Sequence, residues 1–207
     1  MKNEAKKVYT LYAGVNGAGK STIYNIMKPT EQEKRVNSDE ILLSMGGNWN
    51  LEGDQWKAMR EAAKRVNRYI HEGISFNQET TLAGRTITRS ILKAKECGFL
   101  IRLYYIGLVD AELAVKRVQQ RVKEGGHGID AALIRKRYDN SLTRLKEILP
   151  LCDLAVIYDN TEEFKKLQSM LKIDGSYMTM AVPGLTKSWE FKINAGSESL
   201  PGNNFLR

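Results

Sequence analysis

The sequence predicts a three-layer α/β fold, in which helices cover both faces of a sheet of parallel strands. Three observations support this. Short apolar runs alternate with longer segments of helical periodicity, the first apolar run leads into a glycine-rich turn, and that run is apolar on both faces, as expected in the middle of a parallel sheet. A chain of 207 residues is long enough for one well-buried domain and short for two.

The glycine-rich turn, Gly14 to Thr22, has the spacing of a phosphate-binding P-loop. It follows a strand expected over Val8–Val15 and precedes a helix expected over Ser21–Met27. In this motif backbone N–H groups point at phosphate oxygens, Lys20 reaches the terminal phosphates, and the hydroxyl of Ser21 or Thr22 meets Mg2+. The expected nucleotide-binding residues are Gly14, Asn16, Gly17, Ala18, Gly19, Lys20, Ser21 and Thr22, with Ser21 as the metal ligand. An ordinary strand-to-helix turn is the alternative.

The other expected elements follow in alternation. Further strands are expected over residues 34–37, 74–78, 99–108 and 153–158. Helices are expected over residues 56–72, 85–96, 110–124, 131–148 and 162–171. Residues 176–182 and 187–193 are expected to pair as a hairpin, and residues 194–207 are expected to form a loose tail. We therefore expect one domain over residues 1–193, with a lid over about residues 117–137.

Two helices carry apolar stripes that are expected to face the core. The first stripe consists of Trp56, Met59, Ala63, Val66 and Ile70, and the second of Leu113, Val118 and Val122. The two cysteines, Cys97 and Cys152, stand far apart in apolar surroundings and are expected to be buried thiols of a reduced compartment, not a disulfide or a metal site.

The net charge and the N-terminal sequence bear on two questions, whether the protein binds nucleic acid and whether it is exported or placed in a membrane. The net charge of +8 suggests nucleic acid as a partner, but much of the Lys and Arg lies in helices of mixed sign, and a nucleotide-binding enzyme also needs cations, so direct nucleic-acid binding is disfavoured. Residues 1–7 lack the apolar core of a signal peptide, and no run is long enough to span a bilayer. We therefore expect a cytoplasmic protein without a membrane partner.

Polar residues follow the predicted strands at the edge where parallel α/β sheets bind ligands. Asp39, after the second strand, is our candidate general base for phosphoryl transfer, because a carboxylate near the γ-phosphate can accept the proton of an acceptor hydroxyl. Two alternatives stay open. Asp39 could hold a water on Mg2+, or it could be a residue without a catalytic role in a first helical turn that Asn37 and Glu40 cap.

Glu79 and Thr81 follow the third strand and precede Gly84 and Arg85. A carboxylate beside hydroxyl groups is suited to bind the hydroxyls of a sugar or a similar acceptor, so we expect Glu79, Thr81 and Arg85 to contact the acceptor together with Asp39. Glu79 could instead be a Mg2+ ligand, and a turn with a helix cap is the third interpretation.

Cationic side chains flank the glycine-rich loop around His127. Arg117, Arg121 and Arg137 suit a lid that closes over a triphosphate and stabilises charge on the transferring group. A solvated helix face is the alternative for Arg117 and Arg121. For His127 we expect a structural role. Asn160, after the last strand, is expected near an adenine, although a plain turn would explain it as well.

The order of these motifs resembles the zeta toxin family of P-loop kinases, in particular its short bacterial branch. The matching motifs are Gly17 to Thr22, Asn37 to Glu40, Glu79 to Leu82 with Gly84-Arg85, Arg117-Val118 with Arg121-Val122, Gly125-Gly126-His127, Arg137-Tyr138 with Ser141-Leu142, and Asp159-Asn160. The sequence departs from the pattern of the branch at Val15, Lys136 and Ile129-Asp130. The departures remove no chemical group from the mechanism and leave the acceptor open.

The resemblance implies an adenylate-kinase-like core with a five-stranded parallel sheet and a helical lid, ATP and Mg2+ as cosubstrates, and transfer of the γ-phosphate to a hydroxyl. In the best-known members the acceptor is UDP-N-acetylglucosamine, and an antitoxin protein is a possible partner. By matching motif, Lys20 would bind phosphates, Asp39 would deprotonate the acceptor, Glu79 and Thr81 would hold the sugar, and the lid arginines would contact ATP.

These inferences lead to one expected function and two alternatives. We expect an ATP-dependent kinase of a small-molecule hydroxyl, with a nucleotide sugar as the leading candidate. A kinase of another acceptor, such as a nucleoside, a cofactor or a nucleic-acid 5'-hydroxyl, is the first alternative. A nucleotide-binding switch without transferase activity is the second.

Overall fold

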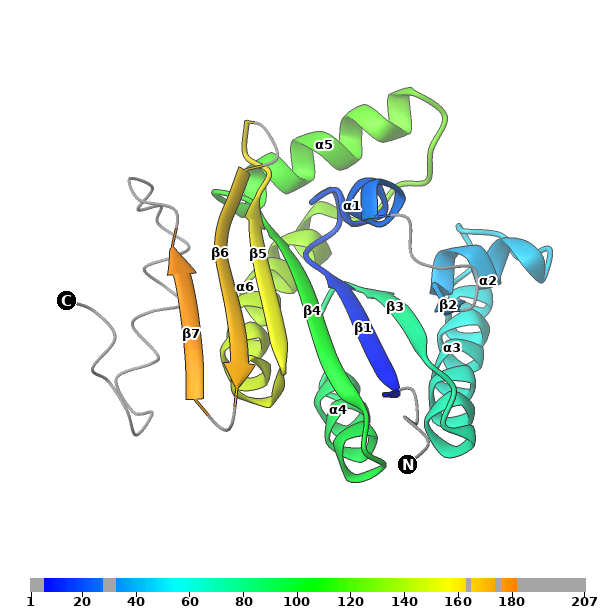
Figure 1. Cartoon of the computed structure of the whole chain (residues 1–207). Coiled ribbons are helices and arrows are strands. Elements are labelled where there is room, and N and C mark those ends of the chain that lie inside the picture. Colours follow the sequence, from blue (N-terminus) through cyan, green and yellow to red (C-terminus); the bar gives the residue numbers. More distant parts are fainter. Residues whose placement is uncertain (1–5, 28–32, 163–164, 174–175, 182–207) are drawn as a thin grey trace.

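The fold is seen in a computed structural model of the chain (Figure 1), which describes residues 6–27, 33–162, 165–173 and 176–181. The strand expected over residues 187–193 and the tail expected over residues 194–207 lie outside the described residues.

Five parallel strands form the centre of the sheet. They are β1 (Val8–Ala13), β2 (Lys34–Val36), β3 (Phe76–Thr80), β4 (Leu100–Gly107) and β5 (Leu154–Asp159). Their spatial order is β2-β3-β1-β4-β5, and each neighbouring pair runs parallel. The predicted parallel α/β sheet is thereby confirmed. Because β3 and β4 flank β1, the carboxyl ends of all three strands surround the turn that follows β1.

Two antiparallel strands extend this sheet beyond β5, where the sequence predicts a helix. β6 (Lys165–Ile173) pairs with β5, and β7 (Ser176–Ala181) pairs with β6. The helix expected over residues 162–171 is therefore wrong. Residues 176–181 form a strand, as expected, and pair with β6, while the expected pairing with residues 187–193 involves residues outside those that the structure describes. The free edge of β5 offers backbone groups to any extended segment, and local periodicity cannot reveal such long-range pairing.

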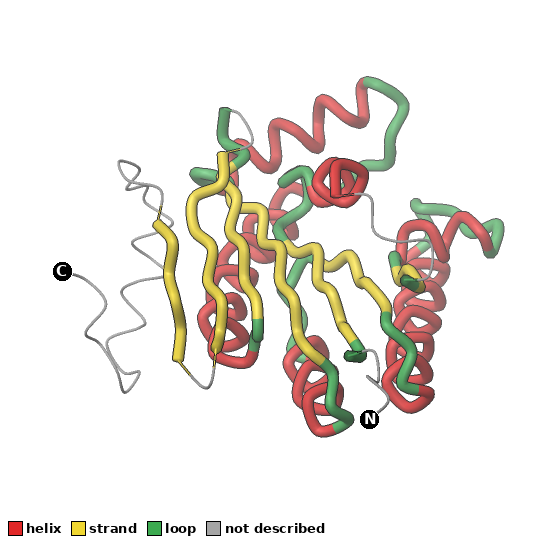
Figure 2. Tube along the Cα trace, viewed as in Figure 1, coloured by secondary structure: helices red, strands yellow, loops and turns green. Residues whose placement is uncertain are grey.

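The helices are α1 (Lys20–Met27), α2 (Ser38–Ser44), α3 (Glu52–Glu72), α4 (Thr86–Glu96), α5 (Ala111–Lys123) and α6 (Ala131–Ile148), and a 3-10 turn (Leu149–Leu151) follows α6. α3, α4 and α6 lie behind the sheet in the view of Figures 1 and 2, whereas α1, α2 and α5 lie at the carboxyl ends of the parallel strands. Three helices are thus gathered at the edge where the functional residues are expected.

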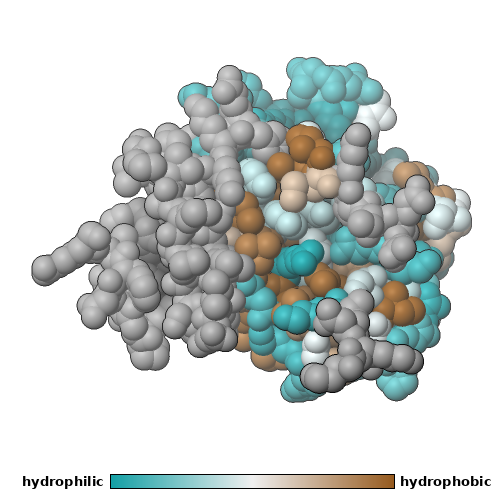
Figure 3. Space-filling view, viewed as in Figure 1, coloured by the Kyte–Doolittle hydropathy of each residue, from teal (hydrophilic) through white to brown (hydrophobic). Residues whose placement is uncertain are grey.

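The core lies between the sheet and α3, α4 and α6. Leu11, Ile101 and Leu103 of the sheet and Ile91 of α4 are fully buried in it. In Figure 3 apolar residues reach the surface over α1 and along the middle of the sheet, on the face seen in Figure 1. Among the described residues, no helix combines the length and the apolar character needed to cross a membrane.

The inward face of α3 differs from the prediction at its start. Trp56, Met59 and Ala63 are exposed, and Ala58 and Ala62 are buried in their place, in line with Val66 and Ile70. Small residues let the helix lie close to its neighbours, and the hydrogen bond from Trp56 Nε1 to Glu52 Oε1, 3.2 Å long, keeps the indole at the surface. A pattern that counts large apolar side chains misses a stripe made of alanines.

Two further predictions of burial are wrong. Val122 is exposed because it lies one turn beyond the buried residues of α5, beside the lid loop. Cys97 is exposed because it caps the surface end of α4, whereas Cys152 is buried as expected.

Candidate functional site

The turn after β1 requires glycine at two positions. Gly14 has a φ of +146°, and a Cβ there would lie 2.4 Å from the carbonyl oxygen of Ile106 at the end of β4. Gly17 has a φ of +80°, and a Cβ there would lie 2.9 Å from the carbonyl oxygen of Ala114 on α5. The backbone of the turn is therefore pressed between β4 and α5, which leaves its other side for a ligand.

Lys20 is buried in the first turn of α1, and its Nζ donates to the carbonyl oxygen of Val15 at 3.2 Å. Burial lowers the pKa of Lys20, while the carboxylates of Glu79 and Asp39 act in the opposite direction and raise the pKa. The ammonium group is thus held inside the turn, in the field of two acidic side chains, where a phosphate would meet it.

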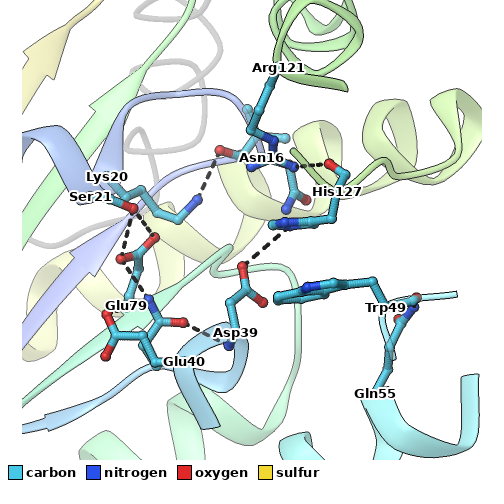
Figure 4. Close-up of polar contacts among 12 residues, drawn as sticks. Asn16, Lys20, Ser21, Asp39, Glu40, Trp49, Gln55, Glu79, Arg121 and His127 are labelled. Carbon is cyan, nitrogen blue, oxygen red and sulfur yellow. Dashed lines mark hydrogen bonds and ion pairs between the residues drawn. The ribbon is translucent and has the colours of Figure 1, made fainter. Parts of the chain in front are cut away.

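Glu79 connects three elements of the site. It lies on β3 beside Tyr12 of β1, and its carboxylate accepts hydrogen bonds from Ser21 Oγ, at 3.0 and 3.2 Å, and from Asn37 Nδ2 at 3.1 Å. Its ion pair with Arg35 Nη2 is 2.8 Å long, and the two side chains are only 10% and 14% exposed. Figure 4 shows Glu79 facing Ser21. The Glu79 carboxylate is thus tied to Ser21 in the first turn of α1 and to the start of α2.

Arg35 is a residue of the site that sequence reasoning missed. Besides Glu79 it pairs with Glu40, and its guanidinium carbon lies 3.5 Å from the centroid of the Tyr24 ring. These carboxylates and hydrogen bonds raise the pKa of Arg35 although burial, the largest single influence, lowers it. A lone arginine in a three-residue strand gives no sequence signal for such a role.

Asp39 lies in the first turn of α2, and both the capping and the functional interpretation fit its geometry. Asn37 caps the helix by accepting from the backbone N–H of Asp39 at 2.8 Å, and Asn37 Nδ2 reaches Glu40 Oε1 at 3.4 Å. The cap uses the backbone of Asp39, so its carboxylate stays available. That side chain is 48% exposed and projects toward His127 (Figure 4).

Two hollows meet at Asp39. One hollow, of about 1010 Å³ and called the donor hollow after the role expected for the P-loop, is lined by the P-loop, Ser21, Thr22 and the lid residues Arg117 and Arg121. The other, of about 470 Å³ and called the acceptor hollow after the role expected for Thr81, lies between α3, β3, α4 and α6. The residues that line both are Asn16, Lys20, Asn37, Asp39, Trp49, Glu79, His127 and Gly128. The expected general base therefore stands in the wall that the two hollows share.

The three lid arginines bond to different parts of the site. Arg137 on α6 donates to Asn16 Oδ1 at 3.0 Å, and burial lowers its pKa. Arg121 on α5 donates to the carbonyl oxygen of His127 at 2.9 Å, while Arg117 donates to the carbonyl oxygen of Thr161 at 3.2 Å. Arg117 and Arg121 thus line the donor hollow, and Arg137 lines the acceptor hollow.

Of the remaining predicted residues, some line the two hollows and others do not. Thr81 lines the acceptor hollow, whereas Arg85 is exposed and lines neither hollow. Asn160 Nδ2 donates to the carbonyl oxygen of Ala18 at 2.9 Å, which ties the end of β5 to the P-loop. Between β3 and α4, Leu82 is fully buried and has a φ of 61°, the left-handed region that side chains other than glycine rarely adopt.

An aromatic pair that the sequence analysis did not predict closes the wall between the hollows. The His127 ring stacks on the Trp49 ring with centroids 3.9 Å apart and planes at 6°, and Nε2 of His127 lies 3.6 Å from Oδ2 of Asp39 (Figure 4). Burial and Arg121 lower the pKa of His127, and Asp39 raises it. The glycines around His127 marked the loop, but nothing near Trp49 indicated its partner.

Comparisons with known proteins agree with this architecture. An uncharacterized protein of Haemophilus influenzae is 35% identical over 127 residues, which cover 61% of this chain and 89% of that protein. Solved structures with the same fold include the AvrRxo1-ORF1:AvrRxo1-ORF2 complex with ATP (TM-score 0.65, 16% identity, covering 95% of this chain and 82% of that one). The PezAT toxin–antitoxin system of Streptococcus pneumoniae is also similar (TM-score 0.57, 15% identity, covering 91% and 78%).

These structural similarities confirm the α/β P-loop kinase fold. The profile of the AAA domain family matches residues 10–146, the segment from β1 into α6 that contains the P-loop, Asp39, Glu79 and the lid. The chain belongs to the AAA domain family.

Proposed function

We propose that this protein is an ATP-dependent kinase that transfers the γ-phosphate to a hydroxyl group of a small molecule. One observation carries the proposal: the carboxylate of Asp39 stands in the wall shared by a P-loop hollow and a second hollow of about 470 Å³. A nucleotide-binding switch needs only the first hollow. The second hollow supports a transferase, because an acceptor bound there can present its hydroxyl to Asp39.

The residues around the wall divide the chemistry between them. ATP supplies the phosphoryl group from the donor hollow, where the turn after β1 and Lys20 hold its phosphates. Asp39 accepts the proton of the acceptor hydroxyl, and Arg121 and Arg137 stabilise the charge that spreads over the transferring group. The lid of residues 117–137 excludes water from this wall, which limits transfer to water.

Mg2+ fits the residues beside the P-loop. Ser21 Oγ and the Glu79 carboxylate lie 3.0 Å apart, and both are oxygen ligands suited to a hard cation. The described residues contain no group of three or more His, Cys, Asp or Glu that could hold a metal. This agrees with an ion that takes most of its ligands from phosphates and water. Ser21 would hold the ion, Glu79 would orient Ser21, and the ion would neutralise phosphate charge.

For the acceptor we propose a nucleotide sugar, with UDP-N-acetylglucosamine as the first compound to test. The support is the resemblance to the zeta toxin family at Glu79 to Leu82 and the structural similarity to the PezAT toxin–antitoxin system. The acceptor hollow combines the apolar side chains of α3 with the polar groups of Gln55, Thr81 and Ser90, as a site for a hydroxylated molecule requires. A separate antitoxin chain is a proposed partner on the same grounds.

The transfer is tested by incubating the protein with ATP, Mg2+ and UDP-N-acetylglucosamine and following the sugar nucleotide by mass spectrometry. We expect a gain of one phosphoryl group. A product with another hydroxyl compound and none with the nucleotide sugar would keep the kinase and reject this acceptor. ATP hydrolysis without transfer to any compound of a hydroxyl panel would favour a nucleotide switch.

The role of Asp39 is tested by Asp39→Asn, with Asp110→Asn as the matched control. Loss of a general base is expected to lower kcat by about 10² to 10⁴ while ATP affinity changes little. Asp110 caps α5 by accepting from the N–H of Leu113 at 2.8 Å and lines neither hollow, and asparagine caps helices equally well. Transfer that survives Asp39→Asn would show that Asp39 is not the base.

A further inference from the structure

The lid and the acceptor side of the site meet in a ring stack. His127 comes from the loop between α5 and α6, with glycine at positions 125, 126 and 128, and Trp49 comes from the connection between α2 and α3. Their ring centroids are 3.9 Å apart and their planes are nearly parallel, at 6°. A loop so rich in glycine has little conformational preference of its own, so its position depends on contacts such as this one.

The backbone of each of these two residues is also held by a side-chain hydrogen bond. The carbonyl oxygen of His127 accepts from Arg121 Nη2 at 2.9 Å, and the carbonyl oxygen of Trp49 accepts from Gln55 Nε2 at 2.6 Å. Both rings line the donor hollow and the acceptor hollow. The stack therefore borders the site on both sides and is not part of the interior of the fold.

The imidazole also faces the expected base. Nε2 of His127 lies 3.6 Å from Oδ2 of Asp39, and the His127 side chain is only 18% exposed whereas that of Asp39 is 48% exposed. At 3.6 Å the two atoms lie just beyond hydrogen-bond length, so a neutral imidazole with its proton on Nε2 donates to this carboxylate once a small shift of the loop brings them together. Lys20 and Arg137 also act on the Asp39 carboxylate through their charge, but among the described residues the polar contact found for this carboxylate is the one with His127. The imidazole is therefore placed to orient it.

We propose that His127 is a positioning residue that couples the two halves of the site. Its stack on Trp49 holds the lid loop against the acceptor side, and its Nε2–H orients the Asp39 carboxylate toward the acceptor hydroxyl. Because Arg121 lines the donor hollow and holds the backbone of His127, a nucleotide that draws in Arg121 also fixes the base. This inference rests on the proposed kinase function, but the coupling itself is measurable without turnover.

The stack is tested first by the fluorescence of Trp49. The chain has three tryptophans, and Trp56→Phe with Trp189→Phe leaves Trp49 as the only tryptophan, which is excited selectively over the tyrosines. With His127 present we expect Trp49 to be shielded from acrylamide, and more so with a non-hydrolysable ATP analogue. In the same background His127→Gln is expected to raise the quenching constant several-fold. Equal quenching of Trp49 with and without the His127→Gln substitution, both in the presence and in the absence of the ATP analogue, would overturn the proposed coupling between the lid loop and the acceptor side.

Two substitutions then separate the ring from the hydrogen-bond donor. His127→Phe keeps a stacking ring but loses Nε2–H, so kcat is expected to fall roughly tenfold or more, as for a lost hydrogen bond to a charged group, with the affinity for the ATP analogue unchanged. His127→Gln loses the ring that holds the loop, so the affinity for the analogue is expected to fall about threefold to tenfold and kcat is expected to fall with it, whereas His127→Phe lowers kcat alone.

His71→Gln is the control, because His71 is the other histidine of the chain and lies exposed at the end of α3. Melting temperatures near that of the wild type would establish that all variants fold. Wild-type kcat in His127→Phe would overturn the positioning of Asp39. If the wild-type protein phosphorylates no acceptor, the proposed function fails, while the fluorescence and affinity measurements still decide whether His127 couples the two hollows.

Discussion

The hydroxyl of Ser21 donates to the carboxylate of Glu79 at 3.0 Å, across 58 positions of the chain. This contact joins the helix after the P-loop to the end of β3. The same carboxylate accepts from Arg35 and Asn37, so a single side chain sets the relative positions of α1, β2 and the start of α2.

Glu79→Gln tests this arrangement. The amide has the shape of the carboxylate but no charge. Arg35, which is largely buried, then keeps Glu40 as its one ionic partner among the described residues. The free energy of unfolding is therefore expected to fall by roughly 1–3 kcal/mol. Chemical denaturation measures it. Glu40→Gln removes the exposed partner of the same arginine and is expected to cost less than about 1 kcal/mol. Equal losses in the two variants would contradict a special position for Glu79.

Gly14→Ala tests the close packing of the P-loop. A Cβ 2.4 Å from a carbonyl oxygen at a φ of +146° forces the turn to move, so nucleotide affinity is expected to be lost even if the fold survives. Isothermal titration with an ATP analogue measures the affinity. Gly53→Ala lies in open space in the first turn of α3 and is expected to bind nucleotide as the wild type does. Unchanged affinity in Gly14→Ala would refute the packing argument.

Thr81→Val and Arg85→Ala test which of these two residues contacts the acceptor, since the sequence predicts both and the structure places only Thr81 in the acceptor hollow. Thr81 lines the acceptor hollow, so losing its hydroxyl is expected to raise the KM of the acceptor about tenfold and leave the KM of ATP unchanged. Arg85 lines neither hollow, so the KM of the acceptor is expected to stay constant. Steady-state kinetics check both. A raised KM in Arg85→Ala would restore the assignment that sequence reasoning made.

A proton NMR titration tests the environment of His127. Burial and Arg121 hold the pKa of His127 below its ordinary value, and Asp39 opposes them. Asp39→Asn should therefore lower this pKa further, and Arg121→Gln should raise it. His71→Gln assigns the two histidine signals. No movement of the His127 signal in Asp39→Asn would contradict the contact between the two side chains.

The same shift links His127 to folding stability. The unfolded chain binds the proton at the ordinary pKa and the folded chain only at a lower one, so the unfolded state carries more protons in the window between them. The free energy of unfolding should then rise with pH through that window, which begins below about 6.5. Denaturation curves measured across this range in the wild type and His127→Gln isolate the effect. A slope that His127→Gln leaves unchanged would assign it to other groups.

Much of the site could be predicted because the fold is built from parallel strands. Residues that directly follow parallel strands must converge at one edge of the sheet, so Lys20, Asp39, Glu79 and Asn160 could be brought together from spacing alone. Their order along the chain carried the resemblance to a kinase family. The parallel sheet and the edge that carries these residues could thus be predicted from local sequence patterns.

The rest depends on packing between distant segments. The contact of Trp49 with His127 and the ion pair of Arg35 with Glu79 join loops and strands whose approach no local pattern describes. β6 was predicted as a helix because its pairing partner, the edge of β5, is visible only in the assembled sheet. Arg85 shows the opposite error, because adjacency in sequence to Thr81 did not carry it into the site.

At Leu82, just after the end of β3, the backbone conformation favours glycine whereas the buried position favours a large apolar side chain. At a φ of 61° glycine would relieve roughly 1–2 kcal/mol, but removing a fully buried leucine side chain costs about 2–5 kcal/mol. Because the second cost exceeds the first, the chain keeps its strained turn. Replacing Leu82 by glycine or by a smaller apolar residue is therefore expected to lower the stability of the fold, and the buried leucine anchors the turn between β3 and α4 in the core.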